Sequence, residues 1–192
     1  MTHNHSYPSM PVSGTIFTGE LVRLSAPLPE DHAIMAQWSN NAEYLRLLDG
    51  DPVRPETPEF FANFKSSDTS VHFHVRTLAD DRMIGFLGLF NIKWPCQSAI
   101  LGMAIGDPAY WNKGYGTGAL CLMLQYAFDE LNLFRVSLEV LGYNTRAIRL
   151  YEKVGFVREG VQRQAFKRDG RRWDVYNYAI LADDYYALKA EL

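Results

Sequence analysis

Apolar and polar residues alternate with a period of two in several short stretches of this chain, which is the pattern of half-buried β-strands. The clearest stretch runs from residue 71 to residue 78, where valine and phenylalanine alternate with histidine and arginine. Short turns separate it from two further apolar stretches, so three antiparallel strands are expected here. The strands are predicted at residues 20–24, 71–78, 83–94, 99–106, 135–141, 156–166 and 172–180, with a hairpin turn at Arg168-Asp169-Gly170 before the last.

A period of three to four residues predicts helices in other parts of the chain. The longest covers residues 119–131, where Leu120, Met123, Leu124 and Leu131 form one apolar stripe. Residues 46–58 hold three prolines and three acidic residues and are predicted to be a loop. Further helices are predicted at residues 29–40 and 59–64, from Asn144-Thr145 to a stop at Gly155, and at residues 182–192.

The order of these elements predicts the fold class. Residues 99–106, the long helix and residues 135–141 form a strand–helix–strand crossover, which makes the two strands parallel. The other strands follow one another through short turns and are expected to be antiparallel. We therefore expect an α/β (α+β) domain with a mixed, mostly antiparallel sheet, a central parallel pair and flanking helices.

Composition limits the classes of function. With 192 residues, 47% of them hydrophobic, one domain over residues 14–192 is expected, after a flexible tail at residues 1–13. The net charge of -3 gives no support to nucleic-acid binding, and no stretch is apolar enough to span a membrane. Two cysteines without metal-type spacing fit a reducing, cytoplasmic compartment. The chain is expected to be a monomer or a homodimer.

The segment from Trp111 to Gly118, here called the glycine-rich segment, has three glycines in five residues directly before the long helix. Free backbone N–H groups at such a helix start form a seat for an anion, most often phosphate, although the same glycines also suit a plain turn. Asn144 and Tyr151 are seven residues apart, so they share one face of a helix near the end of the neighbouring parallel strand. Taken alone, Asn144 also suits a helix cap and Tyr151 a core aromatic.

At this point the chain resembles a known family. Residues 111–119 (Trp-Asn-Lys-Gly-Tyr-Gly-Thr-Gly-Ala) and 143–156 (Tyr-Asn-Thr-Arg-Ala-Ile-Arg-Leu-Tyr-Glu-Lys-Val-Gly-Phe) are similar to the two signature motifs of the GNAT acetyltransferases, in the branch of the ribosomal-protein N-acetyltransferases RimJ and RimL. The resemblance extends from Gly19 to Ile180. It implies transfer of an acetyl group from acetyl-CoA to a primary amine of a protein N-terminus, a peptide or a small molecule, across a splayed parallel strand pair.

The resemblance also implies roles for individual residues. Backbone N–H groups from Asn112 to Thr117 would bind the pyrophosphate of acetyl-CoA, main-chain groups of residues 103–105 and Asn144 the cofactor arm, and Tyr151 would protonate the departing thiolate. No metal is implied. The implied cofactor-binding residues are Met103, Ala104, Ile105, Trp111, Asn112, Lys113, Gly114, Tyr115, Gly116, Thr117, Asn144, Ala147 and Tyr151.

The base that deprotonates the amine is not evident. Many relatives carry a glutamate where this chain has Ile100, and Trp111 replaces a Gln or Arg, so a stacking contact is expected there. Glu139 is the candidate replacement for the base, while a water relay or an ordinary strand-face carboxylate are alternatives. His72 and His74 share one face of a strand and are expected to face solvent or to be hydrogen-bonded.

Two other functions remain open. Residues 114–119 satisfy G-x-G-x-x-A, with Glu139 about twenty residues on, which is also found in dinucleotide-dependent oxidoreductases. The loss of a glutamate at Ile100 suggests a non-catalytic acyl-CoA sensor. The acidic residues Asp49, Asp51 and Glu56 suit a cationic substrate such as a polyamine, whereas the basic residues between 158 and 172 suit an acidic partner or a solvated hairpin.

Overall fold

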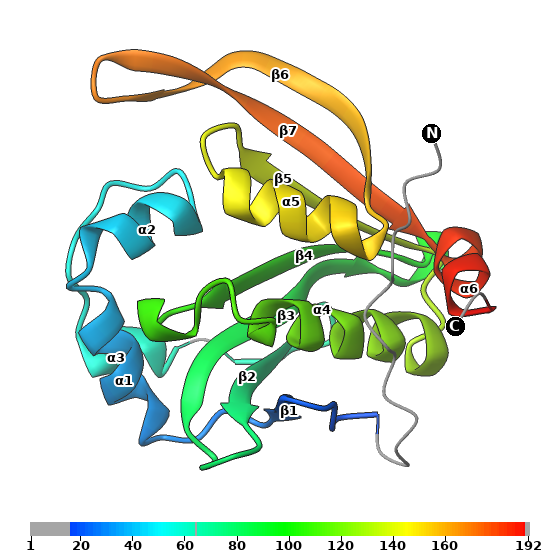
Figure 1. The fold of residues 1–192 in the computed structure, drawn as a ribbon, viewed down its shortest axis with the longest axis horizontal. Helices are drawn as coiled ribbons and strands as arrows, with labels where there is room; N and C mark the ends of the chain where they lie inside the picture. Colours follow the sequence, from blue (N-terminus) through cyan, green and yellow to red (C-terminus); the bar gives the residue numbers. More distant parts are fainter. Residues whose placement is uncertain (1–15, 64, 191–192) are drawn as a thin grey trace.

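A single seven-stranded sheet runs through the molecule (Figure 1). The computed structural model describes residues 16–63 and 65–190, so the predicted tail at residues 1–13 lies outside the described part. The strand order is β1-β2-β3-β4-β5-β7-β6, and only β4 and β5 pair in parallel, which confirms the predicted fold class. The strands are β1 (Val22–Ser25), β2 (Val71–Thr77), β3 (Met83–Lys93), β4 (Ser98–Ile105), β5 (Arg135–Leu141), β6 (Val157–Arg168) and β7 (Arg171–Leu181).

The helices agree with the prediction at most positions, and none in the described residues is long and apolar enough to cross a membrane. A short π-helical turn (Tyr126–Glu130) continues α4, and 3₁₀ turns occupy Trp94–Cys96 and Pro108–Tyr110. The last two residues of the predicted C-terminal helix and residue 64 are not described. The helices are α1 (Asp31–Trp38), α2 (Ala42–Leu48), α3 (Pro58–Phe61), α4 (Tyr115–Gln125), α5 (Thr145–Val154) and α6 (Ala182–Ala190).

Helix α2 was not predicted, and the predicted loop began at Arg46, inside it. The side-chain oxygen of Asn41 accepts hydrogen bonds from the backbone N–H groups of Glu43 and Tyr44 and so caps the helix start. Two turns are too short to show an apolar period, and the prolines that follow favour a loop. The boundary of the loop is therefore corrected to the residues after Leu48.

Helix α4 begins at Tyr115, four residues before the predicted start. Gly114 precedes it with a φ of +89°, a conformation that favours glycine, but Gly116 and Gly118 are helical. A Cβ on Gly116 would lie 3.6 Å from Leu150 of α5, and one on Gly118 would lie 3.4 Å from Val22 of β1. Both distances are ordinary van der Waals contacts, so of the three glycines only Gly114 is required by its backbone conformation.

The parallel pair at the sheet centre is short. Strand β4 pairs with β5 at Ser98, Ala99 and Ile100 only, whereas it stays paired with β3 as far as Ile105. Beyond Ile100 the two parallel strands diverge, and this confirms the expected splay. Helices α4 and α5 both lie on the same side of the sheet, in front of this divergence (Figure 1).

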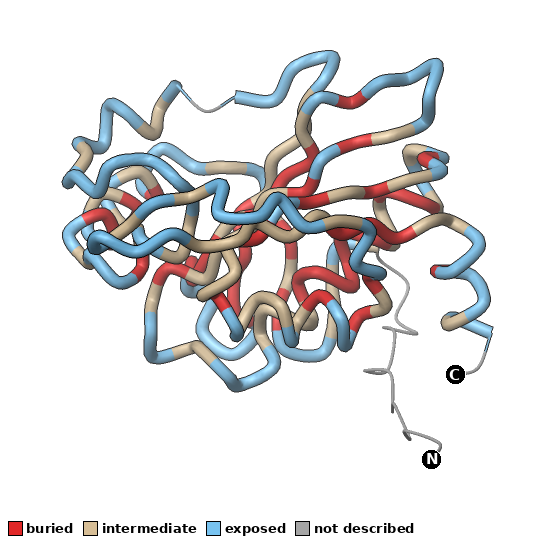
Figure 2. The backbone as a smooth tube through the Cα atoms, turned by 90° about the horizontal axis from the view of Figure 1, so that it is seen from above, coloured by how far each residue is buried: buried red, intermediate tan, exposed pale blue. Residues whose placement is uncertain are grey.

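The main core lies between α4 and the sheet. The buried side chains from Ala119 to Leu124 pack against β3, β4 and β5, and Figure 2 shows the buried residues concentrated in the middle of the molecule. Complete burial of each large aliphatic side chain contributes about 1.5–3 kcal/mol, so this layer fixes the position of α4 on the sheet. The strand side chains in this layer include Leu87, Leu89, Leu101, Val136, Leu138 and Val140.

The opposite face of β2 carries a buried ionic network. Asp31, at the start of α1, is fully buried, and its carboxylate accepts hydrogen bonds from the Arg76 guanidinium at 2.6 and 2.7 Å. The Nδ1 atom of His74 lies 2.7 Å from the same carboxylate. Of the two alternatives left open for this histidine, the hydrogen-bonded one is confirmed, and the network fixes α1 on the sheet.

Burial lowers the pKa of His74, and this effect outweighs the attraction of Asp31. Because Arg76 already balances the single carboxylate, a second cation would be buried without a counter-charge. His74 is therefore neutral near pH 7 and donates its Nδ1 proton to Asp31. The unfolded chain takes up a second proton on the His74 imidazole more readily than the folded chain does. The free energy of unfolding therefore decreases as the pH falls below about 6.5, the ordinary pKa of histidine.

We expect Asp31→Asn to lower the free energy of unfolding by about 3–5 kcal/mol, because it leaves the Arg76 cation buried without a charged partner. The measurement is urea denaturation followed by circular dichroism. Asp81→Asn is the matched control, since it removes the same charge from an exposed pair with Arg23 and should cost less than about 1 kcal/mol. Equal losses in the two variants would contradict the role of the network.

Candidate functional site

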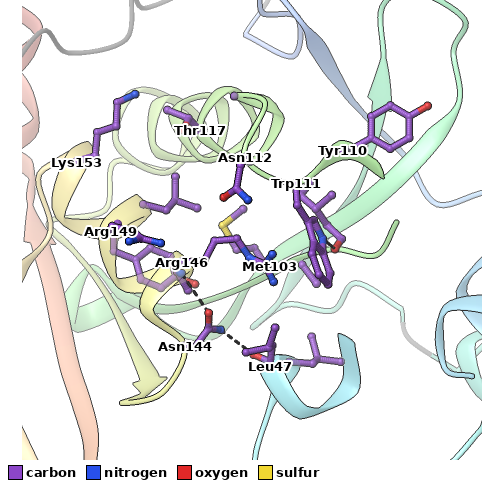
Figure 3. Close-up of a pocket in the computed structure, with 18 of the residues that line it drawn as sticks. Leu47, Met103, Tyr110, Trp111, Asn112, Thr117, Asn144, Arg146, Arg149 and Lys153 are labelled. Atoms are coloured by element: carbon purple, nitrogen blue, oxygen red, sulfur yellow. Dashed lines mark hydrogen bonds between the residues drawn. The ribbon is translucent and has the colours of Figure 1, made fainter. Parts of the chain in front are cut away.

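A pocket of about 370 Å³ opens where β4 and β5 diverge, and we call it the helix-side pocket (Figure 3). Its walls are the glycine-rich segment, the end of β4, one face of α5 and part of α2. None of the residues found to line it is acidic. The lining residues from the predicted set are Met103, Ala104, Ile105, Trp111, Asn112, Gly114, Gly116, Thr117, Asn144, Ala147 and Tyr151.

The start of α4 presents backbone donors to this pocket. The first intrahelical bond runs from the N–H of Gly118 to the carbonyl of Gly114 at 2.9 Å, so the N–H groups of residues 115–117 have no partner within the helix. Asn112 and Gly114 both have positive φ values, which turn the chain sharply just before the helix. Free N–H groups, the helix dipole and the missing side chains of Gly114 and Gly116 make this wall suitable for an anion.

Helix α5 adds positive charge on another wall. Arg146, Arg149 and Lys153 follow one another at spacings of three and four residues, so they share one face of the helix, and all three line the pocket (Figure 3). The sequence reasoning missed them, because the helical period places them on the side of α5 away from Asn144 and Tyr151. Two positively charged features thus line one cavity.

Trp111 closes the pocket near the end of β4. Its indole Nε1 donates a hydrogen bond to the carbonyl of Ile105 at 2.7 Å, and the Arg146 guanidinium stacks 3.6 Å from its ring centroid. One face of the Trp111 ring is therefore occupied by Arg146, and a stacking contact of Trp111 with the cofactor stays a prediction. The hydrogen bond to Ile105 also means that one main-chain acceptor of the residue 103–105 segment already has a protein donor.

Asn144 and Tyr151 both line the pocket but differ in their surroundings. The Asn144 side chain accepts a hydrogen bond from the N–H of Ala147 at 3.1 Å and donates one to the carbonyl of Leu47 at 3.0 Å. It is thus the cap of α5 and a link to α2. The Tyr151 side chain is 8% exposed, and burial raises the pKa of its phenol to about 12, which keeps it protonated at neutral pH.

Three predicted site residues are not brought to this pocket. Lys113 is exposed, and Tyr115 packs against Tyr110 with ring centroids 5.1 Å apart. Glu139 is exposed on the other face of β5, where its carboxylate accepts a hydrogen bond from Gln162 at 2.8 Å. Strand alternation places Glu139 and Tyr151 on opposite faces of the sheet.

A second pocket of about 630 Å³, the loop-side pocket, lies beneath α1, α2, α3 and the loop at residues 49–56. Its floor includes His72, Phe86, Phe90 and Gly102, which the strand register places on the face opposite the α4 core. Asp49, Asp51 and Glu56 lie on its wall, so it is the more acidic of the two cavities. The two pockets share three lining residues, Tyr44, Leu48 and Met103.

The hairpin of β6 and β7 holds α2 over the divergence. Arg46 pairs with Asp169 at 2.7 Å, and the carbonyl of Arg46 accepts hydrogen bonds from Tyr143 and Arg168. Arg168 also donates to the carbonyl of Asp51 at 3.1 Å. Part of the basic hairpin, for which a solvated surface was one interpretation, therefore positions the acidic loop.

Comparison with known proteins identifies the class. Residues 22–157 match the family described as "Acetyltransferase (GNAT) domain", so the chain belongs to the GNAT acetyltransferase family. The predicted class of acetyl-CoA-dependent N-acetyltransferase is thereby confirmed at the level of the family. The oxidoreductase alternative is wrong, because the glycine-rich segment belongs to an acetyltransferase domain.

Three relatives illustrate the match. The probable N-acetyltransferase YjcK of Bacillus subtilis is 39% identical over 61% of this chain and 65% of its own length. The spermidine N(1)-acetyltransferase of Vibrio cholerae is 35% identical over 56% of this chain and 61% of its own length. The crystal structure of the Vibrio cholerae spermidine N-acetyltransferase in complex with CoA and spermine has a TM-score of 0.76 at 27% identity and covers 86% of this chain and 98% of that chain.

We expect Gly114→Asp to weaken the binding of CoA by about tenfold or more, because it adds a carboxylate beside the helix start and strains a positive φ. Isothermal titration calorimetry measures the change. Gly170→Asp is the control, since Gly170 also has a positive φ but lies in the hairpin turn with no atom near its Cβ position. Unchanged binding of CoA in Gly114→Asp would show that this segment does not bind the phosphates of the cofactor.

Proposed function

We propose that this protein transfers the acetyl group of acetyl-CoA to a primary amine of a small, positively charged molecule of the polyamine type. The observation that carries the proposal is the pair of pockets on opposite faces of the sheet, which meet at Met103 in the divergence of β4 and β5. A thioester entering from the helix side and an amine entering from the loop side would meet there. This is the arrangement that direct attack requires.

The helix-side pocket suits the cofactor. In the proposal, the N–H groups of residues 115–117 hold the diphosphate, and Arg146, Arg149 and Lys153 balance the remaining phosphate charge. The unpaired edge of β4 at residues 103–105 holds the pantetheine arm, as the family resemblance implies. Asn144 then contributes by fixing the start of α5 against α2, since both ends of its amide already have partners.

Tyr151 is the proposed acid. A phenol with a pKa of about 12 lies about 3.5 pKa units above an ordinary thiol, so full proton transfer to a solvated thiolate would cost about 5 kcal/mol. Burial raises the pKa of a departing thiolate in the same pocket too, which narrows this difference. Tyr151 therefore donates a hydrogen bond to the sulfur as charge develops and completes the transfer as the bond breaks.

The loop-side pocket suits a cationic acceptor. Glu56 already pairs with Arg54, whereas no ion pair is found for Asp49 or Asp51 in the described part of the chain. These two carboxylates would attract ammonium groups, while Phe60, Phe86 and Phe90 suit the methylene segments between them. The relatives named as spermidine acetyltransferases support the same class of acceptor.

Several finer expectations stay predictions. Membership of the RimJ and RimL branch would make a protein N-terminal amine the acceptor, which needs less deprotonation because its pKa is near 8 against about 10.4 for a lysine-like amine. The choice between monomer and homodimer is open. A cytoplasmic location is supported by the two free cysteines, Cys96 and Cys121.

We expect spermidine and spermine to give faster CoA thiol release from acetyl-CoA than N-terminal peptides or aminoglycosides. The double variant Asp49→Asn/Asp51→Asn should raise the KM for spermidine about tenfold, through the loss of two attractive charges, with less effect at high salt. The control Asp183→Asn/Asp184→Asn removes two exposed charges from α6. Faster reaction with a peptide would move the protein to the RimJ and RimL branch, and no thiol release with any amine would support the sensor alternative.

We expect Tyr151→Phe to lower kcat about 100-fold while the Kd for CoA changes less than about twofold, because the hydroxyl acts on the developing thiolate. Steady-state kinetics and calorimetry measure the two effects. Tyr186→Phe is the control, since its hydroxyl donates to the carbonyl of Phe128 on the far side of α4. A parent-like kcat in Tyr151→Phe would exclude the acid role.

A further inference from the structure

His72 is a titratable group of the loop-side pocket that the proposed function has not used. It lies on β2, half-buried, with its backbone N–H bonded to the hydroxyl of Ser66 at 3.1 Å. Its ring meets the edge of Phe90 with centroids 4.8 Å apart. No hydrogen bond to its ring nitrogens is found among the described residues, so the imidazole keeps a lone pair for another molecule.

The ring leans toward the divergence of β4 and β5. His72 is in register with Gly88 of β3, which is in register with Gly102 of β4. A Cβ on Gly88 would lie 3.3 Å from the His72 Nδ1 atom, so the imidazole lies over β3, at a position where the carbonyl oxygen of Val71, 2.7 Å from the same Cβ, already requires glycine. Since neighbouring strands are about 4.8 Å apart, this brings the ring to within about one strand of Gly102 and Met103.

The two glycines of β3 have different roles. From the sequence, Gly85 and Gly88 both allow a bulge or bend; the register shift between β2 and β3 lies next to Gly85, whereas the pairing is regular on both sides of Gly88. A Cβ on Gly88 would lie 2.7 Å from the carbonyl oxygen of Val71 and 3.1 Å from the Phe90 ring. The missing side chain leaves a shallow trough in the floor of the loop-side pocket, bordered by the rings of His72 and Phe90.

The surroundings keep His72 neutral. Burial lowers its pKa below 6.5, and the neighbouring His74 lowers it further. His74 is bound to Asp31 through Nδ1 and is only 5% exposed, so it is less accessible from the pocket than the half-buried His72. The other titratable or charged groups that line the cavity are His32, Tyr44, His74, Asp49, Asp51, Arg54 and Glu56.

We propose that His72 accepts the proton of the attacking amine, directly or through one water molecule. This inference rests on the proposed function and supplies the base that Ile100 does not provide. Ile100 lies on the same face as His72, pairs with Phe90 and is 43% exposed. Because its side chain is apolar and cannot accept a proton, a neighbouring residue has to deprotonate the amine.

The proton balance of the step is complete. The neutral amine nitrogen forms the bond to the acetyl carbon, which makes that nitrogen strongly acidic, and its proton passes to His72. The carbon–sulfur bond then breaks, and the thiolate takes the Tyr151 proton. Solvent removes the proton from His72 and restores the one on Tyr151, so the products are an N-acetyl amine and CoA with a free thiol.

The test is the pH dependence of kcat/KM for acetyl-CoA with spermidine, between pH 5.5 and 9, in the full chain. In the parent, both the substrate ammonium and His72 must lose a proton, so the logarithm of the rate should rise with a slope of about two below the lowered pKa of His72 and about one above it. His72→Gln should follow a slope of about one throughout and should be about 100-fold slower at pH 7.

Two further variants test whether His72 acts as a base or only packs in the pocket. His72→Gly should regain activity when imidazole is added to the buffer, because the trough over Gly88 then has room for it. His32→Gln, which removes another imidazole of the same pocket to which no role is assigned, should keep the two-slope profile of the parent.

The outcomes distinguish the two proposals. An active parent together with an unchanged profile in His72→Gln would overturn the role of His72 and leave the proposed function standing. Absence of thiol release in the parent with every amine would overturn the proposed function itself. A slow His72→Gln with the parent's two slopes and no rescue of His72→Gly would make His72 a packing residue only.

Discussion

The early end of pairing between β4 and β5 is the constraint on which the rest of this structure depends. Three residues of parallel pairing hold the sheet together, and after Ile100 the strands separate while β4 remains paired with β3. Backbone N–H and C=O groups on the free edge of β4 then lack a strand partner. Where such groups are buried, they need another hydrogen-bond donor or acceptor. Trp111 supplies one such donor to Ile105, and the rest of this edge faces the helix-side pocket.

The divergence also separates two kinds of electrostatic environment. The helix-side pocket has the N-terminus of α4 and three cations of α5, and its known lining contains no acid. The loop-side pocket has Asp49 and Asp51 on its wall together with several aromatic rings, and burial lowers the pKa of His72 and His74, which also line it. A sheet one residue thick keeps a region suited to phosphates apart from a region suited to ammonium ions, and the two regions meet only at Tyr44, Leu48 and Met103 among the lining residues.

The sequence was sufficient for the parts of the fold that follow from a repeating pattern. Strand alternation and the crossover order gave the sheet and its parallel pair, and the glycine-rich segment gave the helix start. Helix α2 was not predicted, because two helical turns are too short to show an apolar period and because the residues that stabilise it lie far away in the sequence. The sequence placed Glu139 on one face of a strand without showing which face of the sheet the cofactor occupies. The role of Arg146, Arg149 and Lys153 of α5 as pocket residues could be recognised only once the structure showed how α5 packs beside α4.

Helix α2 ends in carbonyl groups that other parts of the chain satisfy. Those of Arg46 and Leu47 accept from Tyr143, Asn144 and Arg168, which lie about a hundred residues further along the chain. An isolated helix of two turns is unstable in water, so α2 depends for its stability on the junction of β5 and α5 and on the distal hairpin. The wall that the two pockets share therefore rests on contacts remote from both of them, and damage to the hairpin would loosen this wall while the central core stayed intact.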